Sequence, residues 1–144
     1  MPIDRDAERE RTNRLMLRAR DAMDRDFARP LDIDTLAGIA ACSPAHFIRT
    51  FRATFGETPH RYLQRRRVER AMFLLRETDR SVSEICLDVG FLSLGSFSRT
   101  FSEIVGESPT AYRAHAEPKG VPTCFTMTWT RPSSFGEARP PGQG

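Results

Sequence analysis

The amino-acid sequence predicts an all-α protein in which two helix-turn-helix units are joined by one long helix. Three observations predict it: an imperfect internal repeat, serine- or threonine-proline pairs where helices should begin, and apolar residues at helical spacing. The chain has 144 residues, of which 39% are hydrophobic, and its ten phenylalanines are enough for a modest core. We expect one domain over residues 9–116, followed by an irregular tail over 117–144.

The repeat defines the two units. Residues 43–62 recur at 93–112 with a constant offset of 50 positions. The positions that are identical in both copies are Ser43, Phe47, Arg49, Thr50, Phe51, Gly56, Glu57, Pro59 and Tyr62. Upstream, the apolar pattern of 36–40 recurs at 85–89 once the second copy is given one extra residue in its turn. Each copy is therefore a helix, a short turn and a second helix, with the first unit at about 32–56 and the second at about 81–106.

Signals at helix ends predict seven helices, at about 9–26, 32–41, 43–55, 58–77, 81–90, 94–105 and 108–115. The pairs Ser43-Pro44, Thr58-Pro59 and Ser108-Pro109 each combine a capping hydroxyl with a proline at the first helical position. Residues 81–84, Ser-Val-Ser-Glu, have the pattern of a capping box. Gly56 and Gly106 are placed to end the helices before Thr58 and Ser108.

Apolar side chains predict which faces of these helices are buried. In the second helix of each unit they recur at i, i+4 and i+8, which forms a stripe on one face. These stripes are Phe47, Phe51 and Phe55 in the first unit and Phe97, Phe101 and Val105 in the second. We expect them to pack with Leu36, Ile39 and Ala40, and with Ile85, Val89 and Phe91, in two small cores. The joining helix at 58–77 would contribute Val68, Met72 and Leu75.

The opposite face of each second helix carries arginine. Arg49 lies two positions from both Phe47 and Phe51, about 200° around the helix, so it points away from the core. Arg99 repeats this geometry in the second copy. An α-helix fits the DNA major groove, where arginine can donate two hydrogen bonds to guanine. A single such face is usually only solvated, but its duplication favours DNA binding. The outward strips are Ala45, His46, Arg49 and Arg52, and Gly95, Ser96, Arg99 and Ser102.

The joining helix is basic, and its predicted length is close to one turn of DNA. Residues 58–77 hold six arginines against two glutamates. A helix of about 20 residues spans roughly 30 Å, close to the roughly 34 Å of one DNA turn, so we expect binding to successive major grooves as a monomer. Its arginines have three interpretations: a solvated face, phosphate contacts, or salt bridges between the units. The candidate phosphate contacts are Arg65, Arg66, Thr50 and Thr100.

Residues 36–112 resemble the tandem helix-turn-helix domain of the AraC/XylS family of bacterial transcription regulators. The resemblance rests on the runs Ile85-Cys-Leu-Asp-Val-Gly-Phe91 and Ser96-Phe97-Ser-Arg99-Thr-Phe101, and on Arg67-Val68 with Ala71 and Leu74-Leu75 in the joining helix. It implies sequence-specific binding to double-stranded DNA and regulation of transcription. The family's contacts correspond to Ala45, Ile48 and Arg49, and to Leu94, Gly95, Ser96 and Arg99. Because only about eight residues precede the first predicted helix, the chain is similar to stand-alone members that lack a sensor domain.

Other functions have less support. We expect no enzyme, because the sequence holds no Ser-His-Asp, paired-carboxylate or phosphate-loop arrangement. Cys42, Cys86 and Cys124 form no C-x-x-C pair, so we expect neither a metal nor a cofactor. No run of apolar residues is long enough for a membrane span and the N-terminus is too charged for a secretory signal, which predicts a cytoplasmic protein with no membrane partner. The alternative is an interaction module of the same fold acting on RNA polymerase or another regulator; the outward arginines count against it, although a polymerase contact could accompany DNA binding.

The tail has its own pattern. Residues 123–130 alternate in polarity, with Phe125, Met127 and Trp129 on one side, which predicts a single strand. Since a lone strand is not stable, it must dock on this domain, pair with a second chain, or remain loose. Residues 131–144 are rich in proline, glycine and serine and are predicted to be disordered.

Overall fold

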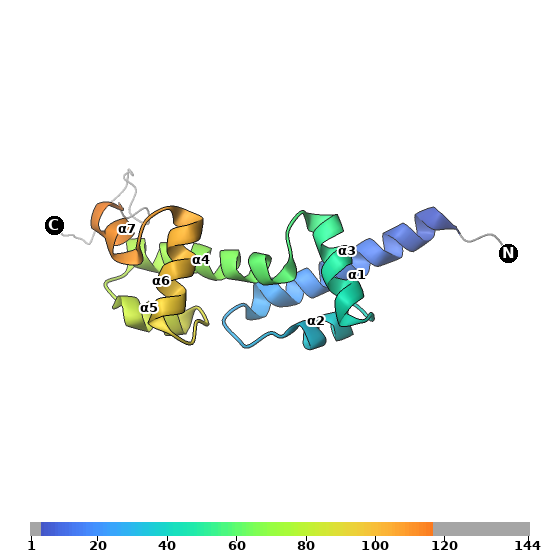
Figure 1. Cartoon of the computed structure of the whole chain (residues 1–144), viewed down its shortest axis with the longest axis horizontal. Coiled ribbons are helices and arrows are strands. Elements are labelled where there is room, and N and C mark those ends of the chain that lie inside the picture. Colours follow the sequence, from blue (N-terminus) through green and yellow to red (C-terminus); the bar gives the residue numbers. More distant parts are fainter. Residues whose placement is uncertain (1–3, 117–144) are drawn as a thin grey trace.

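The computed structural model describes residues 4–116, and these residues form seven α-helices joined by short loops (Figure 1). The all-α prediction is confirmed for this part of the chain. The predicted strand at 123–130 and the tail at 117–144 lie outside the described residues. The helices are α1 (Arg5–Asp26), α2 (Ile33–Ile39), α3 (Pro44–Phe55), α4 (Pro59–Glu77), α5 (Val82–Asp88), α6 (Leu94–Val105) and α7 (Pro109–His115).

The helix ends follow the capping signals of the sequence. Ser43, Thr58 and Ser108 each accept a hydrogen bond from the amide three residues later and are followed by proline. Ser81 and Glu84 form the predicted capping box, in which each side chain bonds the backbone amide of the other. The helix α1 begins four residues earlier than expected, because the carboxylate of Asp4 accepts from the amides of Asp6 and Ala7.

The turn of each unit contains one residue in the left-handed region. In the first unit this is Ala41, with φ of 57°, and in the second it is Gly90, with φ of 100°. The two positions correspond in the repeat. The extra residue that the sequence predicts in the second turn lies between Gly90 and Ser93. In this segment Leu92 is 95% exposed. The added residue therefore extends the surface of the turn and leaves the core pattern unchanged.

Two separate cores hold the two units. The first is built around Phe47 and Phe51, and the second around Phe97 and Phe101, all of which are fully buried. Helix α4 contributes to both cores: Tyr62 and Leu63 near its start belong to the first, and its later residues Val68, Ala71 and Leu75 belong to the second. Phe27, just after α1, packs against both. The helix α4 is thus a structural part of each unit as well as their connection.

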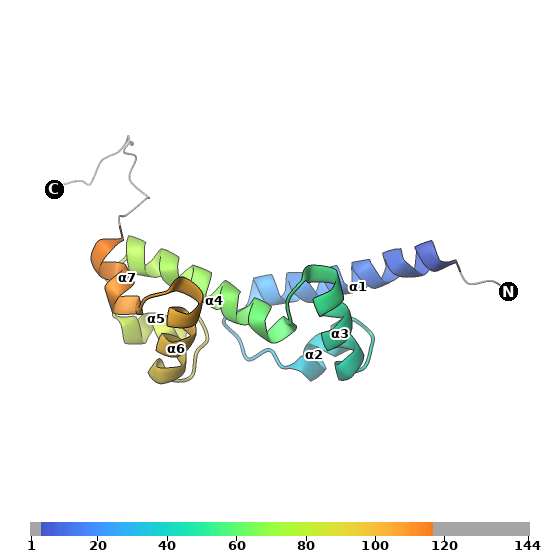
Figure 2. The ribbon, with the colours of Figure 1, turned by 45° about the horizontal axis from the view of Figure 1, so that its top comes forward.

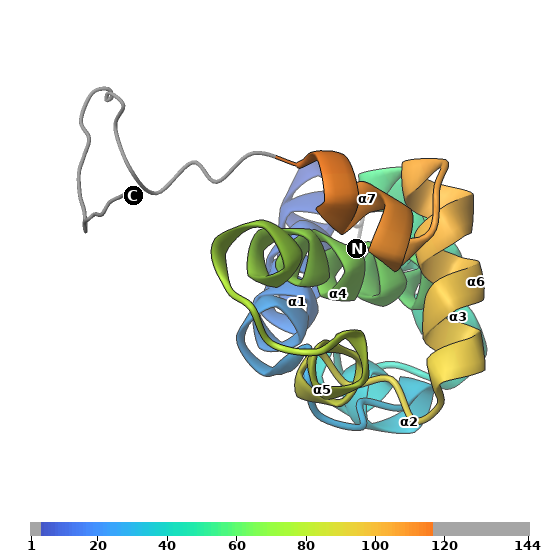
Figure 3. The same cartoon turned by 90° about the vertical axis from the view of Figure 1, so that its left-hand side faces the viewer.

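The two units have the same orientation along the molecule. In Figure 2 both project to the same side of the line formed by α1 and α4. In Figure 3, which looks along the long axis, α6 lies in front of α3 and α5 lies in front of α2. The second helices of the two units, α3 and α6, therefore share one side of the protein. No helix in residues 4–116 is long and apolar enough to span a membrane.

Candidate nucleic-acid interface

The surface of α3 and α6 that faces away from the cores carries the predicted contact residues. Those on α3 are exposed, namely Ala45, His46, Ile48, Arg49 and Arg52. Those on α6 are also exposed, namely Leu94, Gly95, Ser96 and Arg99. Thr50, Thr100 and Ser102 are half-buried. The structure thus brings the predicted residues of each unit together on one helix face, and places the two faces on the same side of the molecule (Figure 3).

The arginines on these two faces have no interaction partner in the described part of the protein. Within residues 4–116, Arg49, Arg52 and Arg99 make no hydrogen bond, ion pair or ring contact. An arginine without an internal partner has all five N–H donors available for a ligand. The repeat places Arg49 and Arg99 at equivalent positions, so the same unpaired donor is presented twice.

The start of α3 is organised by local hydrogen bonds. The amide of His46 donates to Oγ of Ser43, and its ring Nε2 lies 3.3 Å from Oγ1 of Thr50, one turn later. This pair holds the imidazole along the helix surface beside Arg49. On α6 the amide of Ser96 donates to Oγ of Ser93, and Ser96, the counterpart of His46, has the smaller polar side chain. The first unit therefore offers more polar side chains than the second.

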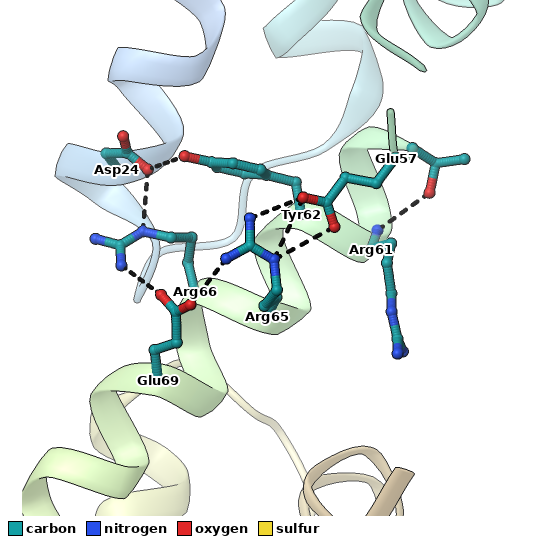
Figure 4. Close-up of polar contacts among 8 residues, drawn as sticks. Asp24, Glu57, Arg61, Tyr62, Arg65, Arg66 and Glu69 are labelled. Carbon is teal, nitrogen blue, oxygen red and sulfur yellow. Dashed lines mark hydrogen bonds and ion pairs between the residues drawn. The ribbon is translucent and has the colours of Figure 1, made fainter. Parts of the chain in front are cut away.

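The candidate phosphate contacts on α4 have partners inside the protein (Figure 4). Arg65 places Nη2 at 2.7 Å from Oε2 of Glu57 and Nη1 at 2.8 Å from Oε2 of Glu69. The hydrogen bond to Glu57 is the main reason that the pKa of Arg65 is raised. Arg66 pairs with Glu69 at 2.8 Å and with Asp24 at 3.0 Å. A phosphate contact by either arginine stays a prediction, and it would have to compete with these carboxylates.

Asp24 ties α1 to α4 and was not found from the sequence. Its Oδ1 accepts from the hydroxyl of Tyr62 at 2.6 Å as well as from Arg66 (Figure 4). Burial, together with this bond to Asp24, raises the pKa of Tyr62 from 10.0 to about 12. The sequence offered only a weak signal for this contact, because an aspartate on a charged helix resembles any solvated carboxylate.

Arg67 links the end of α1 to the second unit. It donates from Nε to the carbonyl oxygen of Phe27 at 2.6 Å and from Nη2 to that of Arg29 at 2.9 Å. Its guanidinium also lies 5.9 Å from the ring centre of Phe91 in the second unit. In the sequence Arg67 belongs to the family motif of the joining helix, but the motif alone assigns it no contact. Its position among three consecutive arginines, each turned about 100° from the next, was the available signal.

A cleft of about 570 Å³ separates the two units beside this link. It lies between the start of α4, the loop before α2 and the turn of the second unit. Leu31 and Leu63 contribute from one side, and Leu87 and Leu92 from the other. Leu87 and Leu92 are 66% and 95% exposed. The sequence did not reveal this surface, because both leucines fall within a strongly apolar segment.

The described residues include two free cysteines, Cys42 and Cys86. Burial raises the pKa of the thiols of Cys42 and Cys86, which keeps them protonated and poor nucleophiles. In residues 4–116 no group of three or more His, Cys, Asp or Glu side chains is arranged to hold a metal ion.

Comparison with known proteins identifies the family. A helix-turn-helix domain model matches residues 36–115. The chain is 33% identical over 91 residues to the regulatory protein SoxS of Salmonella typhimurium, covering 63% of this chain and 85% of SoxS. It is 40% identical over 81 residues to an HTH-type transcriptional regulator of Haemophilus influenzae, covering 56% of this chain and 27% of that protein. The chain spans only 27% to 34% of the length of the first four curated relatives.

The solved structures agree with the sequence matches. The DNA-binding domain of the transcriptional factor AdpA, in complex with a target DNA, is 33% identical with a TM-score of 0.67. The match covers 69% of this chain and 90% of that one. A regulator with an AraC-type DNA-binding domain from Chromobacterium violaceum is 30% identical with a TM-score of 0.65, covering 70% and 90%. With two helix-turn-helix units on a shared helix, a domain match over most of the described residues and these relatives, the chain belongs to the AraC/XylS family of transcription regulators.

Proposed function

We propose that this protein regulates transcription by binding a specific site in double-stranded DNA, with α3 and α6 in successive major grooves. The observation that carries the proposal is the presentation of Arg49 and Arg99 at equivalent positions, exposed and without internal partners, on two helices that share one side of the molecule. Similarity to AdpA, whose domain is solved with a target DNA, supports it.

The joining helix supports binding by a single chain. The 19 residues of α4 span about 28 Å at 1.5 Å per residue, close to the roughly 34 Å of a turn of DNA. The two units carry their own copies of the contact surface, so one molecule holds both halves of the interface. We therefore propose that a monomer occupies one site with two elements about ten base pairs apart.

The residues have different tasks in this proposal. Arg49 and Arg99 read bases, and Arg52, His46 and Ser96 add polar contacts beside them. Ala45, Ile48, Leu94 and Gly95 allow close approach and apolar contact, for example with a thymine methyl group. Thr50 and Thr100 contact phosphates at the groove edges. Readout by the second unit is therefore concentrated on Ser96 and Arg99.

A cytoplasmic location belongs to the same proposal, because bacterial DNA is in the cytoplasm. A contact with RNA polymerase stays a prediction. The proposal is tested by selecting sites from random DNA with the purified chain and counting the protein molecules on the enriched site. Enrichment of one motif with two elements, bound by one chain, is expected; a motif with a single element, or two chains on each site, would contradict it.

A further inference from the structure

The residue Arg67 lies where three parts of the protein meet. Its Nε and Nη2 donate to the carbonyl oxygens of Phe27 and Arg29, which belong to the end of α1 and the loop that follows. The last carbonyl groups of a helix have no hydrogen-bond partner within the helix. A guanidinium that donates to them also interacts favourably with the negative end of the helix dipole. On its other side, the same guanidinium faces the ring of Phe91 in the turn of the second unit.

The turn of the second unit packs so closely against this junction that a side chain at Gly90 would crowd it. A Cβ atom placed on Gly90 would lie 3.0 Å from the carbonyl oxygen of Ala28 and 3.0 Å from Nε of Arg67. Gly90 also has φ of 100°, which side chains rarely allow. The glycine thus lets the loop after α1, the guanidinium of Arg67 and the second turn pack directly on one another.

The first and second units share few other contacts. Helices α1, α2 and α3 pack with one another, and α5, α6 and α7 pack among themselves, while helices of both groups pack against α4. A cleft lies beside the junction, between the units. Apart from the shared helix α4 and the ring of Phe27, which packs against both cores, the orientation of one unit relative to the other therefore depends on the contacts of Arg67, Ala28 and Gly90.

We propose that Arg67 is a positioning residue that fixes the orientation of the second unit relative to the first, and thereby sets the spacing between the two DNA elements that the protein reads. The spacing part of this inference rests on the proposed function. A rigid connection gives the second unit a high effective concentration at one spacing and a low one at others. Loss of the junction would leave each unit folded on its own core but let α4 bend between Leu63 and Val68, where it passes from the first core to the second.

The second unit supplies a matched control. Arg113 donates from Nε to the carbonyl oxygen of Leu75 at 3.1 Å and from Nη2 to that of Thr78 at 3.1 Å, at the end of α4. It therefore makes the same kind of contact as Arg67, but entirely between α4 and α7. Arg67→Met and Arg113→Met each remove two hydrogen bonds to helix-end carbonyls. Only Arg67→Met should alter the orientation of the second unit relative to the first. Arg67→Lys is a milder variant in case Arg67→Met folds poorly.

The orientation is measured first in the free protein, which does not depend on DNA binding. Residual dipolar couplings of backbone amides in the two units report whether both units align as one body. One alignment tensor is expected to fit both units in the natural chain and in Arg113→Met, and two different tensors are expected in Arg67→Met. A single tensor in Arg67→Met and in Arg67→Lys would overturn the proposal.

The spacing is measured next, on the DNA site obtained by selection and on versions with one base pair added or removed between the elements. The natural chain and Arg113→Met should lose about tenfold or more in affinity for the altered spacings, whereas Arg67→Met should lose about threefold or less. Equal losses in all three proteins would overturn the role of Arg67 in spacing. If selection enriches no site at all, the proposed function fails, while the dipolar couplings still decide whether Arg67 fixes the orientation.

Discussion

Removal of Arg49 or Arg99 should weaken specific DNA binding without affecting folding. Both side chains are exposed and make no contact within residues 4–116, so substitution by alanine should change the free energy of unfolding by no more than about 0.5 kcal/mol. An arginine that donates two hydrogen bonds to guanine contributes about 1 to 3 kcal/mol of discrimination. The dissociation constant for the specific site should therefore rise about 5- to 150-fold in each variant.

The effects of the two substitutions should be independent, because the arginines lie in different units with separate cores. The losses in binding free energy should add to within about 0.5 kcal/mol in the double variant. Each single variant should also tolerate base changes at one position of the site, and the two positions should lie in different elements. Arg18→Ala is a suitable control, because it removes one exposed positive charge from α1 instead of from α3 or α6.

Fluorescence anisotropy with a labelled copy of the selected site, at several salt concentrations, measures these effects. Each base pair of the site is then changed in turn, which shows where specificity is lost. If Arg49→Ala and Arg99→Ala bind as tightly as Arg18→Ala, or weaken all DNA sequences to the same extent, base readout by these two arginines is refuted.

Three further results are expected. In urea unfolding, Ala41→Gly should stabilise the protein by about 1 kcal/mol, because it relieves the strain of a side chain on a left-handed backbone. Gly90→Ala should destabilise the protein by at least that amount, because it introduces the same strain. A change of the same sign in both variants would contradict the turn geometry. Arg65→Ala should lower the salt dependence of DNA binding by less than the one unit expected for a free phosphate contact, since Glu57 already pairs with it; a decrease of a full unit would show that the ion pair opens on DNA. Because the pKa of Tyr62 is raised from 10.0 to about 12, its contribution to the free energy of unfolding is fully present below pH 10 and is lost as the pH rises towards 12. Tyr62→Phe should therefore remove the decrease in stability between pH 10 and 12. An unchanged decrease in the variant would assign it to another group.

The boundaries of most helices could be predicted because their signals are local. Ser43, Thr58 and Ser108 cap helices from within three residues, and Gly56 and Gly106 end helices with their own backbone conformation. The burial of Phe47, Phe51, Phe97 and Phe101 followed from spacing alone, whereas Phe55 and Val105 at the ends of the stripes are only half-buried. The start of α1 was placed late, because a highly charged segment has no apolar period to mark its first turn, and Asp4 was not recognised as its cap.

The candidate contact surface could be predicted as a face, since residues on one helix keep fixed directions. The partners that Arg66 and Arg67 find on α1 and in the loop after it could not, because they come from distant parts of the sequence. Arg66 and Arg67 bind groups about 40 positions earlier, at Asp24 and Phe27. Three consecutive arginines look alike in a sequence, yet in the fold one pairs with Glu57, one with Asp24, and one with the backbone at the end of α1. The packing of α1 against α4 gives Arg66 and Arg67 their partners, whereas Arg65 pairs with Glu57 in the loop before α4.

The central claim is that one chain reads two DNA elements in successive major grooves. Selection from random DNA, followed by native mass spectrometry of the purified chain on the enriched site, tests it most directly. The account predicts one motif with two elements about ten base pairs apart and one protein molecule on each DNA. Absence of any enriched motif, or a single element bound by one chain, would contradict it.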